Sequence, residues 1–196
     1  MRFISFDTET TGLRPGQICQ LSYVIDDDGV AAGKNYFFAV RSIEPGASNV
    51  HGFTVPMLHK LSNGLIFPDH AEAILTDFES ADLLLAHNFS FDQSFLAAEF
   101  TRSGITPSFP RQLCTMRHFT PICKLPSARP QRSGPGYKYP SLTELTRHLG
   151  ITDKMVSERS KELFSLPHHA EYHDARVDST AVYLCYQKAV TSGLIV

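Results

Sequence analysis

The sequence predicts an α/β fold in which an antiparallel meander precedes an alternation of strands and helices. Apolar stretches at residues 2–8, 18–26 and 34–40 are separated by short polar segments, one of them the turn-like Asp-Asp-Gly at 27–29. Strands joined by such short turns favour antiparallel pairing. The apolar run 83–86 lies between two helical patterns, which favours a buried strand parallel to the first. A mixed sheet with helices packed on it follows.

The other elements follow from helix boundaries and apolar spacing. Thr54 is expected to cap a short helix, and the Pro-Gly at 45–46 before it indicates a loop. Ser141 with Glu144 three residues on forms a capping box at the start of another helix. Further elements are expected as helices at 69–80, 90–103 (closed by Gly104), 141–149 (closed by Gly150) and 174–189 (capped by Asp174), and as a brief strand near Leu113.

Length and composition are those of an ordinary globular protein. The 196 residues, 42% apolar and 19% charged, predict a single domain over 1–196. No apolar run approaches the roughly 18 residues that a membrane span needs, and the N-terminus enters a strand without a signal-like segment. We therefore expect a cytoplasmic protein with no membrane association. The four cysteines have no CxxC spacing, which favours reduced thiols over a zinc site.

Charge is unevenly distributed along the chain. Residues 1–110 hold 6 Lys and Arg against 13 Asp and Glu, whereas residues 111–161 hold 10 against 3. Within the basic segment, residues 124–138 read KLPSARPQRSGPGYK, which predicts a long loop. A basic surface that meets phosphate and a solvated surface without a partner explain this charge equally well.

The stretch FDTETTGL at residues 6–13 carries the strongest chemical signal. Asp7 and Glu9 are two residues apart on the first predicted strand, so both side chains leave the same face. Two adjacent carboxylates repel each other unless a cation lies between them, and hard oxygen ligands favour Mg²⁺ or Mn²⁺. The alternative is a solvated strand end with acidic residues, and for an isolated Asp-x-Glu pair that alternative is the better interpretation.

A second acidic motif, HNFSFD, occupies residues 87–92. Asp92 falls in the first turn of the helix after strand 83–86, where it points back toward the strand ends. Asn88 can hydrogen-bond at the mouth of a crevice there, and Phe89 or Phe91 can offer a flat face to a base. Alternatively, Asp92 only stabilises the helix N-terminus and the phenylalanines belong to the core.

A third motif, HDARVD, occupies residues 173–178. Five residues at 100° each would put His173 and Asp178 about 140° apart on one regular helix. We therefore expect His173 in the loop before the last helix, with Asp174 as the structural cap. A histidine beside metal-bound carboxylates is a natural general base, whereas a lone histidine before a helix is more often a surface residue.

Taken together and in this order, the three motifs resemble the DEDDh family of 3′–5′ exonucleases. The resemblance is closest to the proofreading epsilon subunits of bacterial DNA polymerase III and their free-standing relatives, and it spans Asp7 to Asp178. Asn-Val-His-Gly-Phe-Thr at 49–54 resembles the family's Val-His-Gly-Ile segment, which contacts the 3′-terminal nucleotide. The stretch beginning at Pro140 resembles the helix that precedes the last motif.

The resemblance implies an RNase H-like fold with a five-stranded mixed sheet flanked by helices. It also implies two divalent cations, Mg²⁺ or Mn²⁺, roughly 4 Å apart. Asp7, Glu9 and Asp178 would hold one ion, Asp7 would bridge to the second, and Asp92 would support that second ion largely through water. His173 would take the proton from the attacking water.

The implied reaction is phosphodiester hydrolysis at a free 3′ end, with release of 5′-mononucleotides. The implied substrate is single-stranded or frayed DNA, in proofreading or repair. Leu13 would wedge against the terminal base, and the substrate-binding residues would be Thr8, Thr10, Gly12, Leu13, Val50, His51, Asn88 and Phe91.

Three hypotheses remain open at this stage. DNA is favoured over an RNase T-like or oligoribonuclease-like exoribonuclease, although no motif reads a 2′-hydroxyl. A non-catalytic nucleic-acid-binding module is the least favoured. The polymerase-binding extension of epsilon subunits has no counterpart before Val196, so a polymerase partner is not evident. We also expect the basic loop to touch the incoming strand through Arg129, Arg132 and Lys138.

Overall fold

The computed structural model describes residues 1–127, 136–165 and 174–195. One five-stranded sheet has the order β3-β2-β1-β4-β5. Its strands are β1 (Arg2–Thr10), β2 (Ile18–Asp27), β3 (Val30–Phe37), β4 (Leu83–Ala86) and β5 (Arg111–Cys114). The pairs β1–β2 and β2–β3 are antiparallel, and β1–β4 and β4–β5 are parallel. The predicted five-stranded mixed sheet is therefore confirmed.

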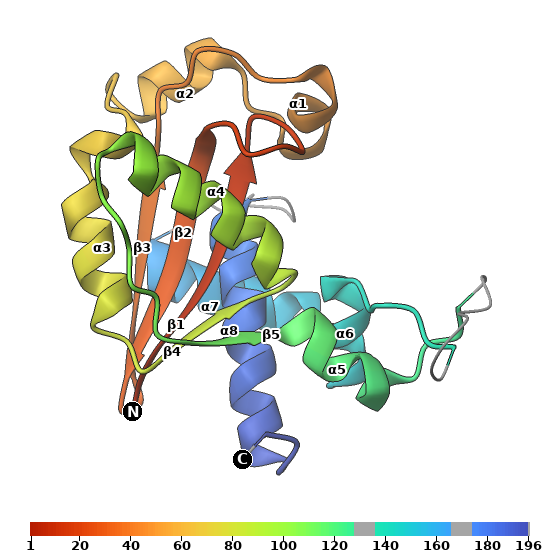
Figure 1. Cartoon of the computed structure of the whole chain (residues 1–196). Helices are drawn as coiled ribbons and strands as arrows, with labels where there is room; N and C mark the ends of the chain where they lie inside the picture. The colour runs from red at the N-terminus through yellow and green to blue at the C-terminus, as the bar shows by residue number, and fades with distance from the viewer. Residues whose placement is uncertain (128–135, 166–173, 196) are drawn as a thin grey trace.

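Helices cover both faces of this sheet. They are α1 (Pro45–His51), α2 (Val55–Leu61), α3 (Ala71–Glu79), α4 (Phe89–Arg102), α5 (Thr115–Cys123), α6 (Leu142–His148), α7 (Asp153–Phe164) and α8 (Ala175–Thr191), with a 3-10 turn η1 (Phe67–Asp69). In Figure 1, α3 and α4 lie on one face, α7 and α8 lie on the other, and α1 and α2 sit beyond the end of β1. None of the described helices is long and apolar enough to cross a membrane.

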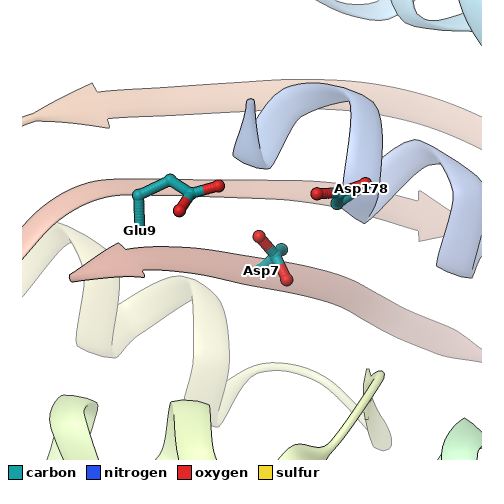
Figure 2. Close-up of side chains that lie close together, drawn as sticks. All are labelled: Asp7, Glu9 and Asp178. Carbon is teal, nitrogen blue, oxygen red and sulfur yellow. The ribbon is translucent and has the colours of Figure 1, made fainter. Parts of the chain in front are cut away.

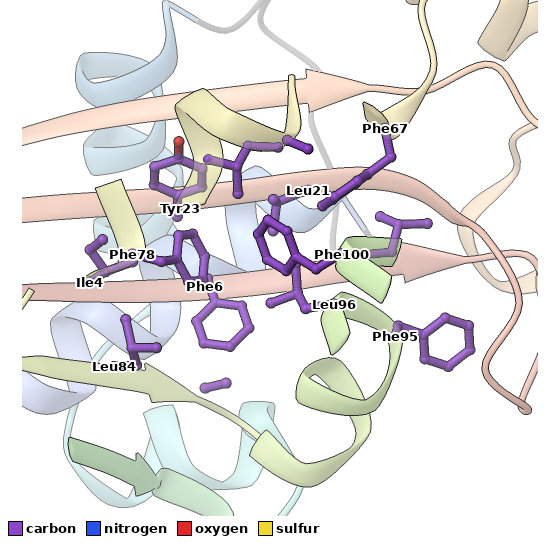
Figure 3. Packing of buried hydrophobic residues seen from close by; sticks show 14 of the residues in the cluster. Ile4, Phe6, Leu21, Tyr23, Phe67, Phe78, Leu84, Phe95, Leu96 and Phe100 are labelled. Atoms are coloured by element: carbon purple, nitrogen blue, oxygen red, sulfur yellow. The ribbon is translucent and has the colours of Figure 1, made fainter. Parts of the chain in front are cut away.

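The strand β1 alternates between the two helical layers. On one side, Ile4 and Phe6 join the largest buried cluster, where aromatic side chains of α3 and α4 meet the sheet (Figure 3). On the other side, Phe3 packs against Tyr183 and Tyr186 of α8. Both faces are therefore fixed by burial, which sets the register of β1.

Small residues bring α8 close to β1. The hydroxyl of Ser5 donates a hydrogen bond to the backbone oxygen of Ser179 at 3.0 Å, and both residues are fully buried. A larger side chain at either position would hold the helix away from the sheet. This contact fixes the first turns of α8 beside the middle of β1.

The short strand β4 leaves part of β1 unpaired on that side. The β1–β4 pairing joins Phe3 to Leu83 and ends with Ser5 opposite Leu85. Beyond Ser5, the carboxyl end of β1 is paired with its antiparallel neighbour β2 but not with its parallel neighbour β4. Ligands of open α/β sheets bind at such a point, outside the carboxyl ends of the strands.

Several predicted boundaries were wrong for identifiable reasons. The predicted loop at Pro45–Gly46 is the first turn of α1, because proline suits the first position of a helix. The third strand is Val30–Phe37 instead of 34–40, because the turn is completed at Gly29 and pairing starts at once. No helix is predicted at 115–123 or 153–164, where α5 and α7 lie.

The predicted helix caps are confirmed. Ser141 and Glu144 form the reciprocal capping box, and the Asp174 side chain accepts a hydrogen bond from the Arg176 backbone. Thr54 caps α2. The cysteines Cys19, Cys114, Cys123 and Cys185 are free, as expected for reduced thiols.

Candidate active site

Three carboxylates converge at the carboxyl end of β1. Asp7 and Glu9 come from β1 and Asp178 comes from the first turns of α8, and each offers an oxygen within 4.8 Å of the others (Figure 2). The alternation of β1 turns Asp7 and Glu9 toward α8, on the same side as Ser5. The Ser5–Ser179 contact then brings Asp178, the residue before Ser179, to them.

A β-bulge lies next to this trio. The β1–β2 register shifts between Glu9 and Thr10, where Glu9 pairs with Gln20 but Thr10 pairs with Ile18. Bulges re-aim a side chain and end regular pairing, and they are common beside active sites. Here the irregularity follows Glu9 directly, one residue before β1 ends at Thr10.

Asp92 approaches β1 from the opposite helical layer. Its carboxylate accepts hydrogen bonds from the hydroxyl of Thr8 at 2.7 Å and from the Thr8 backbone at 3.2 Å. Asp92 is buried, and it is not part of the trio that shares the 4.8 Å limit. The predicted substrate residue Thr8 therefore holds Asp92, and α4 and α8 each bring one carboxylate to the same strand end.

The cluster is electrostatically unfavourable in its metal-free form. Burial, followed by the charges of Asp92 and Asp178, raises the pKa of Asp7 well above its ordinary value. Burial and the Asp178 charge raise the pKa of Glu9 to about 9. Burial raises the pKa of Asp92 to about 7 against the opposing hydrogen bonds from Thr8.

The donor set fits a divalent cation. Among the described residues, no lysine or arginine forms an ion pair with Asp7 or Glu9. Clustered carboxylate oxygens suit hard cations, and one such ion would relieve the repulsion that raises the pKa values. The predicted metal residues Asp7, Glu9 and Asp178 are thus brought together, with Asp92 beside them.

A pocket of about 410 Å³ opens next to the trio. Its wall contains Glu9 and every predicted substrate-binding residue except Asn88. The full lining is Thr8, Glu9, Thr10, Gly12, Leu13, Glu44, Gly46, Ala47, Val50, His51 and Phe91. Asn88 instead precedes α4 in a left-handed conformation (φ 68°) and is exposed.

The pocket is lined both by His51, whose ring is held by hydrogen bonds, and by exposed apolar side chains. His51 Nδ1 accepts from the Phe53 backbone N–H at 3.0 Å, which places the ring proton on Nε2, 3.2 Å from the oxygen of Thr10. Leu13 is 85% exposed and Val50 is 55% exposed on the rim. Exposed apolar side chains gathered at one pocket are a feature of ligand-binding grooves.

Three pocket residues were not predicted from the sequence. Glu44, Gly46 and Ala47 lie at the start of α1, where the sequence predicts a loop. Gly12 lies so close to the Glu44 carboxylate that a Cβ on Gly12 would displace it. The proline after Glu44 was the signal that could have shown the helix and its pocket-facing first turn.

A further acidic residue near the site, Asp174, receives its hydrogen bonds from other side chains of the protein. Asp174 accepts hydrogen bonds from Gln20 Nε2 at 2.9 Å and from Arg176 Nε at 2.8 Å. The Gln20 side-chain oxygen also accepts from the Ala175 backbone at 3.2 Å. Burial alone would raise the pKa of Asp174, but the charge and hydrogen bonds of Arg176 together with the hydrogen bond from Gln20 hold that pKa below its ordinary value.

Some predicted residues lie outside the described residues. They are the general-base candidate His173 and the basic residues Arg129 and Arg132. Of the basic loop, Lys138 is described, and its ammonium pairs with Glu144. The predicted loop 124–138 is also paired at its ends, since Pro126 and Tyr137 form an antiparallel bridge.

No family model and no curated protein sequence matches this chain. Solved structures of exonuclease I do match it. E. coli exonuclease I with a 5cy-dA13 oligonucleotide is 18% identical, with a TM-score of 0.71, over 97% of this chain and 40% of that chain. Exonuclease I from Methylocaldum szegediense gives a TM-score of 0.69, 18% identity and the same coverage.

The zinc-bound form of the E. coli exonuclease I–ssDNA complex matches with a TM-score of 0.67, at 18% identity over 97% of this chain and 40% of that chain. This chain therefore spans about two fifths of the length of these neighbours, and the identity is low enough that the likeness concerns the fold. The chain has the RNase H-like fold of exonuclease I, as its strand order and flanking helices also indicate.

Proposed function

We propose that this protein is a metal-dependent 3′–5′ exonuclease that releases 5′-mononucleotides from single-stranded or frayed DNA. The observation that carries the proposal is the position of Glu9. Glu9 belongs both to the carboxylate trio and to the wall of the 410 Å³ pocket. A cluster of carboxylates that can hold a metal ion, placed beside a pocket of ligand size, is the arrangement needed to hydrolyse a terminal phosphodiester.

Asp7, Glu9 and Asp178 would hold one divalent cation, and Asp7 and Asp92 would support a second. Bound Mg²⁺ or Mn²⁺ would supply an activated water and charge stabilisation for the attacking and leaving oxygens. The protein contributes the convergence of the carboxylates. Thr8 keeps Asp92 in place, and the Ser5–Ser179 contact keeps Asp178 in place.

His173 is our candidate for the general base. It immediately precedes Asp174, whose carboxylate is held by Gln20 and Arg176 at the start of α8. A general base must lie within hydrogen-bond reach of the proton that it removes. This role is supported by the sequence motif and by the anchoring of its neighbour.

The pocket provides the contacts for the terminal nucleotide. Leu13, Val50 and Phe91 offer apolar surface to a base, and Thr10 at the end of β1 and Gly12 in the loop after it line the pocket together with Glu9. A pocket of about 410 Å³ has the size of a site for one small ligand, as a single terminal nucleotide would require. That size supports exonuclease over endonuclease action.

DNA is the substrate that we favour over RNA. The residues of the three acidic motifs resemble those of the epsilon proofreading subunits. Structural neighbours were solved with dA13, dA16 and dT13 oligonucleotides. A role in proofreading or repair follows from the same resemblance.

An end-labelled degradation assay tests the proposal. Matched 3′-OH single-stranded DNA, duplex DNA and RNA are incubated with Mg²⁺, with Mn²⁺ and with EDTA. We expect stepwise shortening of the 5′-labelled single strand with either metal and none with EDTA. Faster shortening of RNA would replace DNA as the substrate, and equal degradation by wild type and Asp7→Asn would remove the catalytic assignment.

A further inference from the structure

A glutamate outside the carboxylate trio lines the same pocket as Glu9. Glu44 lies immediately before α1, and its backbone N–H donates to the oxygen of Thr11 at 2.8 Å. The Glu44 carboxylate lies against Gly12, where a Cβ atom would come within 2.4 Å of the Glu44 Cδ. The backbone hydrogen bond and the missing Cβ of Gly12 therefore place this side chain at the pocket wall.

The carboxylate of Glu44 is not used to build the fold. Glu44 occupies the N-cap position of α1, where a carboxylate ordinarily accepts from the free N–H groups of the first turn, yet its side chain accepts no such bond. Among the described residues, no lysine or arginine forms an ion pair with it. The side chain is therefore an acceptor that is open to the pocket.

Glu44 also stands apart from the metal cluster. The carboxylates with oxygens within 4.8 Å of one another are those of Asp7, Glu9 and Asp178, and Glu44 is not among them. A carboxylate without a cation repels a phosphate. Glu44 therefore suits an uncharged part of a nucleotide, one that donates a hydrogen bond.

The neighbours of Glu44 indicate which part of the nucleotide this is. Leu13 follows Gly12 in the chain, Ala47 and Val50 belong to α1, and all three line the pocket with Glu44. In ligand pockets, apolar side chains supply the contact area and a few polar groups supply orientation and specificity. A base that covers these apolar side chains presents its polar edge to the Glu44 carboxylate.

We propose that Glu44 recognises the 3′-terminal base by accepting a hydrogen bond from its exocyclic amino group. Cytosine has the N4 amino group where thymine has the O4 carbonyl oxygen, so a carboxylate accepts from cytosine and is repelled by thymine at this position. A terminal dC is therefore removed faster than a terminal dT. The inference rests on the proposed exonuclease function and assigns a base preference to its terminal-nucleotide pocket.

Two substrates that yield the same product test this preference. The 5′-labelled strands dT14-dC and dT14-dT differ only in the last base, and the first cleavage leaves dT14 from both. Its rate is measured with Mg²⁺, with enzyme in excess over the strand but below saturation. The variants are Glu44→Gln and Glu44→Ala. Glu72→Gln is the matched control, because Glu72 is an exposed glutamate in the first turn of α3 and lies outside the pocket lining.

Wild-type protein and Glu72→Gln should remove dC about tenfold faster than dT, as one hydrogen bond to a charged acceptor can provide. In Glu44→Gln the ratio should fall to within about twofold of one, because an amide can accept from an amino group or donate to a carbonyl. Glu44→Ala should also lose the preference. Because Glu44 is exposed, both substitutions should leave the melting temperature close to that of the wild type.

Two results would overturn the recognition of the base by Glu44. One is equal removal of dC and dT by the wild type. The other is a dC preference that persists in both Glu44 variants, even where both rates fall, since a contact with the sugar would lower both rates alike. Wild-type protein that shortens neither strand with Mg²⁺ or Mn²⁺ would instead overturn the exonuclease function itself, so the two failures are distinguishable.

Discussion

Two acidic regions meet at the start of α8 and differ in what the protein supplies to them. Asp174 is surrounded by donors from Gln20 and Arg176, and its pKa is lowered. Asp7 and Glu9 face other carboxylates, and their pKa values are raised. All three are largely shielded from water, so the availability of partners separates them. A carboxylate with internal partners builds the fold, and one left among like charges serves a ligand.

The largest expected effect comes from removing one charge of the trio. Asp7→Asn should reduce the exonuclease rate by about a thousandfold or more, because residues that act as a unit fail together. The same substitution should raise the melting temperature of the metal-free protein, since it removes a buried carboxylate that repels its neighbours. Single-turnover kinetics with Mg²⁺ and calorimetry in EDTA measure the two effects.

The matched control is Asp174→Asn, on the structural side of the comparison. It should lower the melting temperature, because the Arg176 side chain loses its charged partner. Opposite signs of the two stability changes are the expected result. If both variants were destabilised equally, the distinction between supported and unsupported carboxylates would be lost.

The pH dependence of stability sharpens the same contrast. The folded pKa of Glu9, about 9, exceeds its ordinary value of 4.5, so the folded form retains a proton that the unfolded form loses. The stability of metal-free protein should therefore be fully present below about pH 4.5 and decrease as pH rises toward 9, with Asp7 and Asp92 adding to the trend.

Thermal melts between pH 5 and 9, with and without Mg²⁺, measure this dependence. Mg²⁺ should remove most of the decrease, because a bound cation stabilises the ionised carboxylates. Glu9→Gln should flatten the EDTA curve. A metal-free protein that became steadily more stable toward pH 9 would contradict the raised pKa values.

Local sequence rules predicted the strands and the acidic motifs well. Asp7 and Glu9 could be placed on one face because strand geometry alone fixes that relation. Asp178 joins them through the Ser5–Ser179 contact, which depends on tertiary packing and has no local signal. Family resemblance supplied that link, as it did for seven of the pocket residues.

The missed parts have physical explanations as well. The sequence predicts a loop at Pro45 because adjacent proline and glycine usually interrupt a helix or strand, whereas here they begin α1. The donors on Asp174 include Gln20, which is 154 residues away in sequence, so no spacing rule finds it. Glu44 enters the pocket only because α1 folds over Gly12.

A smaller effect on stability is expected when Gln20, which hydrogen-bonds to Asp174, is replaced. Gln20→Ala removes a buried side chain that bonds Asp174, Asn35 and the Ala175 backbone. We expect a loss of about 1–3 kcal/mol in the free energy of unfolding, as buried polar groups lose partners. Urea unfolding measures it, and Gln112→Ala at an exposed position of β5 is the control. Equal losses in both would mean that Gln20 has no special role.

The smallest stability effect belongs to Leu13, on the rim of the pocket. Because its side chain is 85% exposed, Leu13→Ala should change the free energy of unfolding by less than about 0.5 kcal/mol. It should nevertheless raise KM about fivefold, since the lost apolar contact exists only when a nucleotide covers it. Leu61→Ala, 47% exposed on α2 and outside the pocket lining, is the control. A fall in stability without a change in KM would mean that Leu13 stabilises the fold, as Asp174 does. It would then not belong with Asp7 and Glu9, whose side chains serve a ligand.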